Sequence, residues 1–140
     1  KLCEKHKKVL TKINQKIINK RNNFIHQLSN SLIKKYSTIV VEDIDIQNLV
    51  KQSGCRKQIY NVAWGHFINY LTYKAEYAGC KLIKVNPAYT SQICSRCGLQ
   101  TEHKLRDRTF NCLHCKFEAD RDENAAKNIL RLGLQSLAKA

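Results

Sequence analysis

The 140-residue sequence contains no methionine, not even at its first position. A natural reading frame needs a start codon, so we expect a processed product or a fragment of a longer protein. No run of 18 apolar residues occurs either, which argues against a membrane-spanning helix. Residues 1–20 are rich in lysine and lack the apolar segment and small-residue cleavage site of a signal peptide.

Acidic residues are scarce. The chain has 11 Asp and Glu against 25 Lys and Arg, and its formal charge is +14. A strongly basic chain has nucleic acid as its first expected partner and a membrane surface as its second. The alternative is a basic surface with no specific partner.

The few acids are gathered in two short windows that hold seven of the eleven. The members of these windows are Glu42, Asp43, Asp45, Glu118, Asp120, Asp122 and Glu123. A protein that binds polyanions has little reason to gather carboxylates unless a cation lies among them. Metal-dependent cleavage of phosphodiesters needs such carboxylates.

Glycine and proline are absent from residues 1–35, where the pattern predicts a long helix. Its apolar residues recur at steps of three, four or seven: Leu10, Ile13, Ile17, Phe24, Leu28 and Leu32. A break near Asn22 and Asn23 is left open. Ten of the 35 residues are Lys or Arg, so the polar face is expected to meet solvent and is also suited to phosphate.

The remaining elements alternate between strand and helix. Residues 37–46 are a β-branched run that predicts a strand buried on both faces. A helix is predicted at 61–78, with Gly79 as its C-cap, and a second strand at 80–87. The final helix is predicted from Asp120 through Leu132. This order indicates an α/β fold with a small module inserted before the last helix.

That module carries four of the seven cysteines. They form two Cys-x2-Cys pairs separated by fourteen residues: Cys94, Cys97, Cys112 and Cys115. Two such knuckles complete a tetrahedron of thiolates, so the spacing predicts a zinc site. Four protein ligands leave no position for water, so this zinc is expected to be structural. His103 and His114 lie near the cysteines but are not needed as ligands.

Gly98 follows the first knuckle, where a left-handed turn is expected, and Lys116 takes the same place after the second. The segment between the knuckles carries Lys104, Arg106 and Arg108, which suggests contact with nucleic acid. The other cysteines, Cys3, Cys55 and Cys80, lack ligand spacing and are expected to be buried small side chains or free thiols.

The acids at the last helix divide into two kinds. Asp120 and Glu123 have the spacing of a capping box, which explains both without a ligand. Asp122 lies in line with the small and apolar residues Ala125, Ala126, Ile129 and Gly133. We therefore expect the Asp122 side chain to point toward the sheet, where a carboxylate is costly unless it is paired or binds a metal.

Glu42 presents the same problem on the first strand, in line with Val40 and Ile44. The carboxyl edge of a sheet is where α/β proteins place their active sites. Glu42 and Asp122, meeting at that edge, would make a magnesium site for phosphodiester cleavage. Such a site usually needs a further acid; Asp43 and Asp45 are near in sequence, but Asp43 points to the opposite face.

Three segments resemble a known family: VVEDIDIQNLV, VNPAYTSQICSRCG and ADRDENAAKNIL. They are similar to the C-terminal half of TnpB, the transposon-encoded OrfB-type RNA-guided DNA nucleases, which share a RuvC-like domain with type V CRISPR effectors. The resemblance covers nearly the whole chain. It implies an RNase H-like fold, with core residues 1–88, a zinc ribbon at 89–118 and the final helix at 119–140.

The resemblance also implies roles for particular residues. Glu42 and Asp122 match the second and third of the family's three magnesium-binding acids, and Asn124 and Asp120 look like supporting residues. The family's first acid is an Asp followed by a hydrophobic residue and Gly, upstream of the long basic helix. This sequence contains no such motif, so we expect the 140-residue chain alone not to be a competent nuclease.

By this resemblance the expected partners are DNA, a guide RNA and a missing N-terminal part of the same protein. The expected cofactors are structural zinc and catalytic magnesium, and the expected location is the prokaryotic cytoplasm, at the nucleoid. An alternative from another class is a zinc-ribbon module or remnant that binds nucleic acid without catalysis. A strand-joining transposase is a weaker third reading, because no nucleophilic Tyr or separate acid triad is evident.

Overall fold

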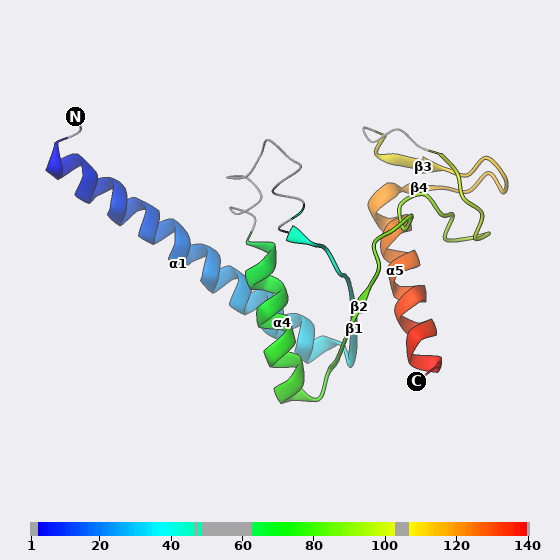
Figure 1. The fold of residues 1–140 in the computed structure, drawn as a ribbon, viewed down its shortest axis with the longest axis horizontal. Helices are drawn as coiled ribbons and strands as arrows, with labels where there is room; N and C mark the ends of the chain where they lie inside the picture. The colour runs from blue at the N-terminus through cyan, green and yellow to red at the C-terminus, as the bar shows by residue number, and fades with distance from the viewer. Residues whose placement is uncertain (1–2, 47, 49–62, 103–106, 140) are drawn as a thin grey trace. The chain divides into compact units, whose positions relative to one another are not determined.

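The computed structural model describes residues 3–46, 48, 63–102 and 107–139. In chain order (Figure 1) its elements are α1 (Glu4–Lys35), β1 (Thr38–Glu42), α4 (Trp64–Ala78), β2 (Lys81–Val85), β3 (Thr109–Asn111), β4 (Glu118–Asp120) and α5 (Arg121–Ala138). The expected mixed α/β character is confirmed. Within these residues, no helix has the length and apolar character needed to cross a membrane.

The chain forms two compact units. The helical unit comprises Lys1–Ser37 and Ile46–Lys81, and the ribbon unit comprises Thr38–Asp45 and Leu82–Ala140. Glu42, Asp122 and the four paired cysteines all belong to the ribbon unit.

In the helical unit, α1 packs on α4 (Figure 1). Helix α1 runs without a break through Asn22 and Asn23. The predicted apolar stripe is not the packed face: Phe24 is 62% exposed, whereas Ile25 and Ser29 are buried. The small Ser29 side chain donates to the Ile25 carbonyl of its own helix at 2.8 Å. Because this side chain does not project outward, α4 can approach α1 closely along the line of Ile25 and Ser29, which lies one residue away from the predicted stripe.

Lys74 of α4 extends the contact between these helices, because its ammonium donates to Ser29 Oγ at 2.8 Å and to the His26 carbonyl at 2.9 Å. Gly79 ends α4 as predicted. Its φ of 67° is left-handed, and the next N–H, of Cys80, donates to the Ala75 carbonyl at 3.0 Å.

In the ribbon unit, β1 and β2 form a two-stranded sheet. Asp43 N–H donates to the Val85 carbonyl just past the end of β1. At the other end, Lys81 N–H donates to the Ser37 carbonyl, so the two strands run parallel. Strand β1 is shorter than predicted and ends at Glu42, which leaves Ile44 outside it. Its residues are half-buried rather than buried on both faces.

Helix α5 covers one face of β1. The closest approach is at Gly133, where an added Cβ would lie 2.5 Å from both Val40 methyl carbons. The prediction that the helix ends there is wrong, since α5 continues to Ala138. Gly133 serves the close packing of helix on strand, at a helix-propensity cost of about 1 kcal/mol relative to alanine.

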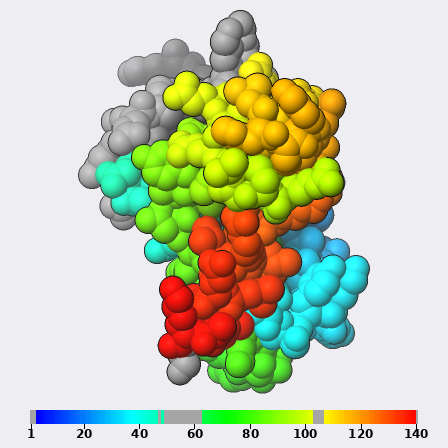
Figure 2. All heavy atoms as spheres, turned by 90° about the vertical axis from the view of Figure 1, so that its right-hand side faces the viewer, coloured from blue at the N-terminus to red at the C-terminus, as the bar shows by residue number. Residues whose placement is uncertain are grey.

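The zinc-ribbon region is built on the antiparallel hairpin of β3 and β4, which pairs Phe110 with Ala119. Phe110 is fully buried and packs with Cys94 and Cys112. Strands β3 and β4 both contact α5, and Figure 2 shows the region, in lime to orange, on the same side of the molecule as the red α5. The hairpin leads straight into the helix, so the ribbon and α5 are positioned together.

Candidate metal centre and carboxylate site

The four cysteines of the two knuckles are brought together. Their Sγ atoms all lie within 4.8 Å of one another. Cys94 Sγ is 3.7 Å from Cys115 Sγ, and Cys97 Sγ is 3.6 Å from Cys112 Sγ. A tetrahedral zinc with bonds of about 2.3 Å places its sulfurs about 3.8 Å apart. The cluster therefore has the size and ligand chemistry of a four-thiolate zinc site, as the sequence predicted.

The two knuckles have the same backbone shape. Gly98 has φ 77° and donates its N–H to the Cys94 carbonyl at 2.8 Å. Lys116 has φ 58° and donates to the Cys112 carbonyl at 3.1 Å. The left-handed turn predicted after both pairs is confirmed. At Lys116 it costs about 1 kcal/mol because a side chain is present.

The thiols of the second knuckle differ in acidity. The Cys115 backbone N–H points at Cys112 Sγ, 3.5 Å away, and lowers the pKa of Cys112 to about 6. Burial raises the pKa of Cys115 to about 12. The backbone geometry and the burial thus favour the thiolate at Cys112 and the protonated thiol at Cys115.

Cys3 and Cys80 take no part in the cluster. Cys3 is exposed, and the half-buried Cys80 thiol lies 3.2 Å from the Tyr36 carbonyl, to which it donates. Cys55 lies outside the described residues, as do His103, Lys104 and Arg106. Arg108 is exposed at the start of the hairpin, and its carbonyl accepts from Arg121 N–H at 2.8 Å.

Asp120 caps α5. Its Oδ1 accepts from the N–H groups of Asp122 at 2.8 Å and Glu123 at 3.1 Å, as predicted. The reciprocal half of the capping box is replaced, because the Glu123 carboxylate pairs with Lys127 at 2.7 Å.

The expectation that Asp122 is buried against the sheet is wrong, because its side chain is exposed. Further along the same helical line, Ile129 is half-buried and Gly133 is buried on β1, but Asp122 lies in the first turn, beyond that contact. Among the described residues, its carboxylate has no hydrogen-bond or ion-pair partner. The burial cost therefore does not explain this acid, and both carboxylate oxygens are open to a ligand.

Glu42 is held from one side. Thr90 Oγ1 donates to Glu42 Oε1 at 2.8 Å. Thr90 is itself 3% exposed. Within the part of the chain that the structure describes, Thr90 is the only hydrogen-bond partner of this carboxylate.

Two buried amides on α5 fix the segment between β2 and the first knuckle. Asn124 donates to the Ile93 carbonyl at 2.8 Å and accepts from Ser95 N–H at 2.9 Å. Asn128 donates to the carbonyls of Thr90 at 2.9 Å and Ile93 at 2.6 Å. Sequence reasoning found Asn124 through the family resemblance but missed Thr90 and Asn128. Asn128 could have been found from its position, because a residue one helical turn after Asn124 lies on the same face of the helix.

These contacts also set the direction of α5 along β1. Gly133 packs at Val40, while Asn128, nearer the start of the helix, bonds the residue that holds Glu42. The N-terminus of α5, with Asp122, thus lies toward the carboxyl end of β1, with Glu42.

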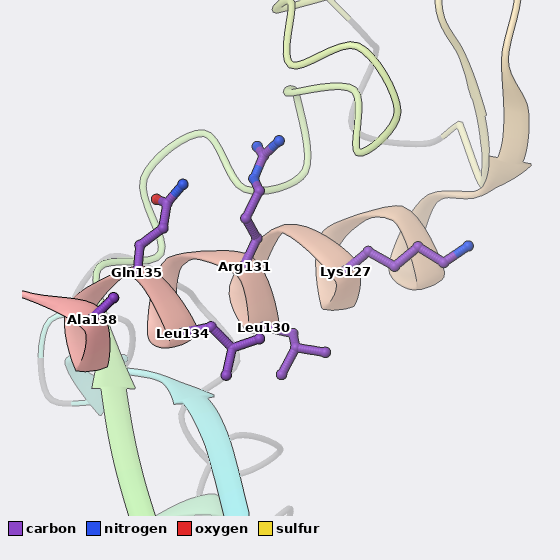
Figure 3. A pocket seen from close by; sticks show the side chains of 6 residues that line it. All are labelled: Lys127, Leu130, Arg131, Leu134, Gln135 and Ala138. Carbon is purple, nitrogen blue, oxygen red and sulfur yellow. The ribbon is translucent and has the colours of Figure 1, made fainter.

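A shallow hollow of about 430 Å³ lies elsewhere along α5 (Figure 3). Its lining is Lys127, Leu130, Arg131, Leu134, Gln135 and Ala138. None of the predicted site residues lines it, so it is separate from the acids and the cysteines.

Residues 64–129 match the family described as Cas12f1-like, TNB domain. The chain is 31% identical over 137 residues to a candidate RNA-guided DNA endonuclease of Streptomyces pristinaespiralis. It is 33% identical over 132 residues to the CRISPR-associated endodeoxyribonuclease Cas12f1 of Sulfoacidibacillus thermotolerans. It is 37% identical over 81 residues to the candidate transposase MJ0856.1 of Methanocaldococcus jannaschii, 74% of which it covers. This chain belongs to the TnpB-like family.

The TnpB-like chain is shorter than most of these relatives. The match to the Streptomyces protein covers 96% of this chain but 34% of that protein, and the match to Cas12f1 covers 90% and 30%. The cryo-EM structure of a Cas12f1–sgRNA–target DNA complex superposes with a TM-score of 0.68 at 24% identity, covering 88% of this chain and 37% of the other. That likeness supports the fold of the TnpB-like chain.

Proposed function

We propose that this chain is the RuvC-like and zinc-ribbon part of an RNA-guided DNA endonuclease, with an RNase H-like core and a catalytic pair formed by Glu42 and Asp122. The proposal is supported by one observation. Both acids belong to one compact unit, in which Glu42 ends β1 and bonds Thr90, the residue that α5 holds through Asn128. The similarity to proteins named as RNA-guided DNA endonucleases supports the reaction class.

The two acids suit a magnesium ion. Mg²⁺ prefers oxygen ligands in octahedral geometry and keeps several waters. Thr90 occupies Oε1 of Glu42 and leaves Oε2 without a partner among the described residues, and Asp122 is exposed. When bound, magnesium would activate a water and stabilise the leaving oxygen of a phosphodiester. The role of this chain would be to hold the two carboxylates at the edge of the sheet.

The zinc-ribbon has a different role. Four thiolates fill a tetrahedral zinc, so the ion would hold the two knuckles together without reacting. It would thereby fix Cys94, which lies between Ile93 and Ser95, the two residues that Asn124 binds.

The basic surface is the proposed contact for nucleic acid. Along α1 the lysines from Lys5 to Lys20 are exposed, with one acid, Glu4, at the helix start. The structural neighbour was solved with an sgRNA and target DNA. We infer that α1, together with Lys104, Arg106 and Arg108, contacts the phosphate backbone of DNA and guide RNA, while base pairing supplies sequence recognition.

The test is Glu42→Ala in a complete TnpB-like protein that contains this chain. We expect the rate of target cleavage to fall by about a thousandfold, because a metal-binding carboxylate contributes several kcal/mol to the transition state. Binding of guide and target is expected to stay at the parent level. Glu76→Ala, which removes an exposed acid from α4, is the matched control. Cleavage by Glu42→Ala at the control rate would overturn the assignment.

The alternative is a module that binds nucleic acid without catalysis. It is favoured by two observations that need no catalytic metal, the clustered cysteines and the formal charge of +14. It predicts salt-sensitive binding of nucleic acid and no binding of Mg²⁺ or Mn²⁺ that depends on Glu42.

A further inference from the structure

Thr90 is a buried hydroxyl with two acceptors. Its Oγ1 lies 2.8 Å from Glu42 Oε1 and 3.0 Å from the Pro87 carbonyl oxygen. A hydroxyl has one proton to donate. Hydrogen bonds to an ionised acceptor are about twice as strong as those to a neutral one, so the proton goes to the Glu42 carboxylate.

Thr90 is also fixed in place. Its N–H donates to the Pro87 carbonyl at 3.4 Å, which closes a turn. Its carbonyl accepts from Asn128 Nδ2 at 2.9 Å. Asn128 is 1% exposed and bonds Ile93 as well, so α5 holds the turn from a buried position. A donor held in this way cannot follow a carboxylate that moves, and it favours one orientation of Glu42.

We infer that Thr90 is a positioning residue for metal binding by Glu42, an inference that rests on the proposed function. The Thr90 hydroxyl holds Oε1, so that Oε2 is presented to the cation in a fixed orientation. Carboxylates that bind metals are commonly held by such partners, and removing the partner typically lowers metal affinity by about 10- to 100-fold. If the hydroxyl instead donated only to the Pro87 carbonyl, its loss would affect folding and leave the metal affinity unchanged.

The experiment measures Mn²⁺ binding to the zinc-loaded 140-residue chain by electron paramagnetic resonance, with Mn²⁺ standing in for Mg²⁺. Thr90→Val keeps the side-chain shape and removes the hydroxyl, and we expect about tenfold weaker binding. Thr90→Ser keeps the hydroxyl and is expected to bind within about twofold of the parent. Thr72→Val is the matched control, because the half-buried Thr72 hydroxyl donates to the Ile68 carbonyl of its own helix. It is expected to bind Mn²⁺ as the parent does.

Glu42→Gln separates this inference from the function on which it rests. If Glu42→Gln binds Mn²⁺ as tightly as the parent, the proposed metal site fails and the role of Thr90 fails with it. If Glu42→Gln weakens binding and a folded Thr90→Val does not, the positioning role is overturned while the metal site stands. Zinc content and thermal melting report whether each variant is folded. Should Thr90→Val not fold, Thr90→Ser must bind about tenfold more tightly than Thr90→Ala, and equal affinities would refute the role.

Discussion

At the scale of the residue, the second knuckle shows how backbone geometry sets thiol chemistry. Cys112 and Cys115 are three residues apart, yet the Cys115 N–H lowers the pKa of Cys112 to about 6, and burial raises that of Cys115 to about 12. A metal-free site is thus already charged at one sulfur. Above the pKa of Cys112, zinc must displace a proton from Cys115 but not from Cys112.

This asymmetry predicts how many protons zinc displaces. At pH 7.5, above the pKa of Cys112, we expect fewer than four protons to leave per zinc bound. As the pH falls toward 5.5, Cys112 takes up a proton. The number of protons that zinc displaces from Cys112 then rises toward one, and the affinity for zinc drops. Calorimetric titration of the reduced, metal-free chain in buffers of different ionisation enthalpy gives the count.

Cys80→Ser is the control for that titration, because Cys80 lies outside the cluster. Its proton count should follow the parent at both pH values. A count of four at pH 7.5, unchanged at pH 5.5, would contradict the low pKa of Cys112.

Local spacing predicted some site residues and not others. The four cysteines and the Asp120 cap could be found because their partners lie a few residues away in sequence or repeat a known spacing. Thr90 and Asn128 could not, since the bonds that they make span 48 and 38 residues. The burial of Asp122 was predicted wrongly because helical periodicity gives a direction but not where the sheet ends.

At the scale of the element, Gly133 shows the same limit. A glycine near the end of an apolar pattern predicts a helix terminus, but here it lies inside α5 against Val40. Whether such a glycine ends a helix or lies inside it depends on the residue that packs against it, and the sequence pattern of one helix does not reveal that residue. For the same reason the buried line of α1, with Ile25 and Ser29, is one residue away from the predicted stripe.

The packing at Gly133 predicts the effect of adding one methyl group. In Gly133→Ala the new carbon would lie 2.5 Å from both Val40 methyls, so strand or helix must shift. Overpacking typically costs about 1–3 kcal/mol, and the better helix propensity of alanine returns about 1 kcal/mol. The difference is a loss of about 0–2 kcal/mol in the free energy of unfolding. Because two methyl carbons lie only 2.5 Å away, we expect the upper half of that range, about 1–2 kcal/mol, measured by urea denaturation.

A double-mutant cycle isolates this contact. Val40→Ala removes the two methyls that the new carbon would meet. In that background the new carbon still lies 3.1 Å from the Cβ of residue 40. Gly133→Ala should then be close to neutral, because the propensity gain of about 1 kcal/mol offsets the crowding that is left. The same loss of stability in both backgrounds would place the cost of the methyl group somewhere other than Val40.

At the scale of the whole molecule, charge is the property that the sequence specifies best. The formal charge of +14 follows from the composition alone. The structure adds that part of this charge lies along the exposed side of α1. The order of the described helices and strands was also predicted correctly, because each of them has a local pattern. The RNase H-like sheet remains a prediction, since the described residues show β1 and β2 only as a two-stranded sheet.

The basic face of α1 predicts a salt dependence of nucleic-acid binding. Each phosphate contact contributes about 0.9 to the slope of log affinity against log salt on duplex DNA. Changing the exposed Lys8, Lys12 and Lys16 to Glu should remove about three such contacts and lower the slope by about 3. Fluorescence anisotropy with a labelled duplex, from about 50 to 200 mM salt, measures it.

A second triple variant separates a specific face from general charge. Changing the exposed Lys81, Lys84 and Lys139 to Glu lowers the net charge equally, from +14 by six units to +8. If α1 contacts the phosphates, this control should lower the slope by less than about 1, because it removes long-range attraction but no contact. If both triples lower the slope alike, binding follows net charge alone and α1 is not the contact face.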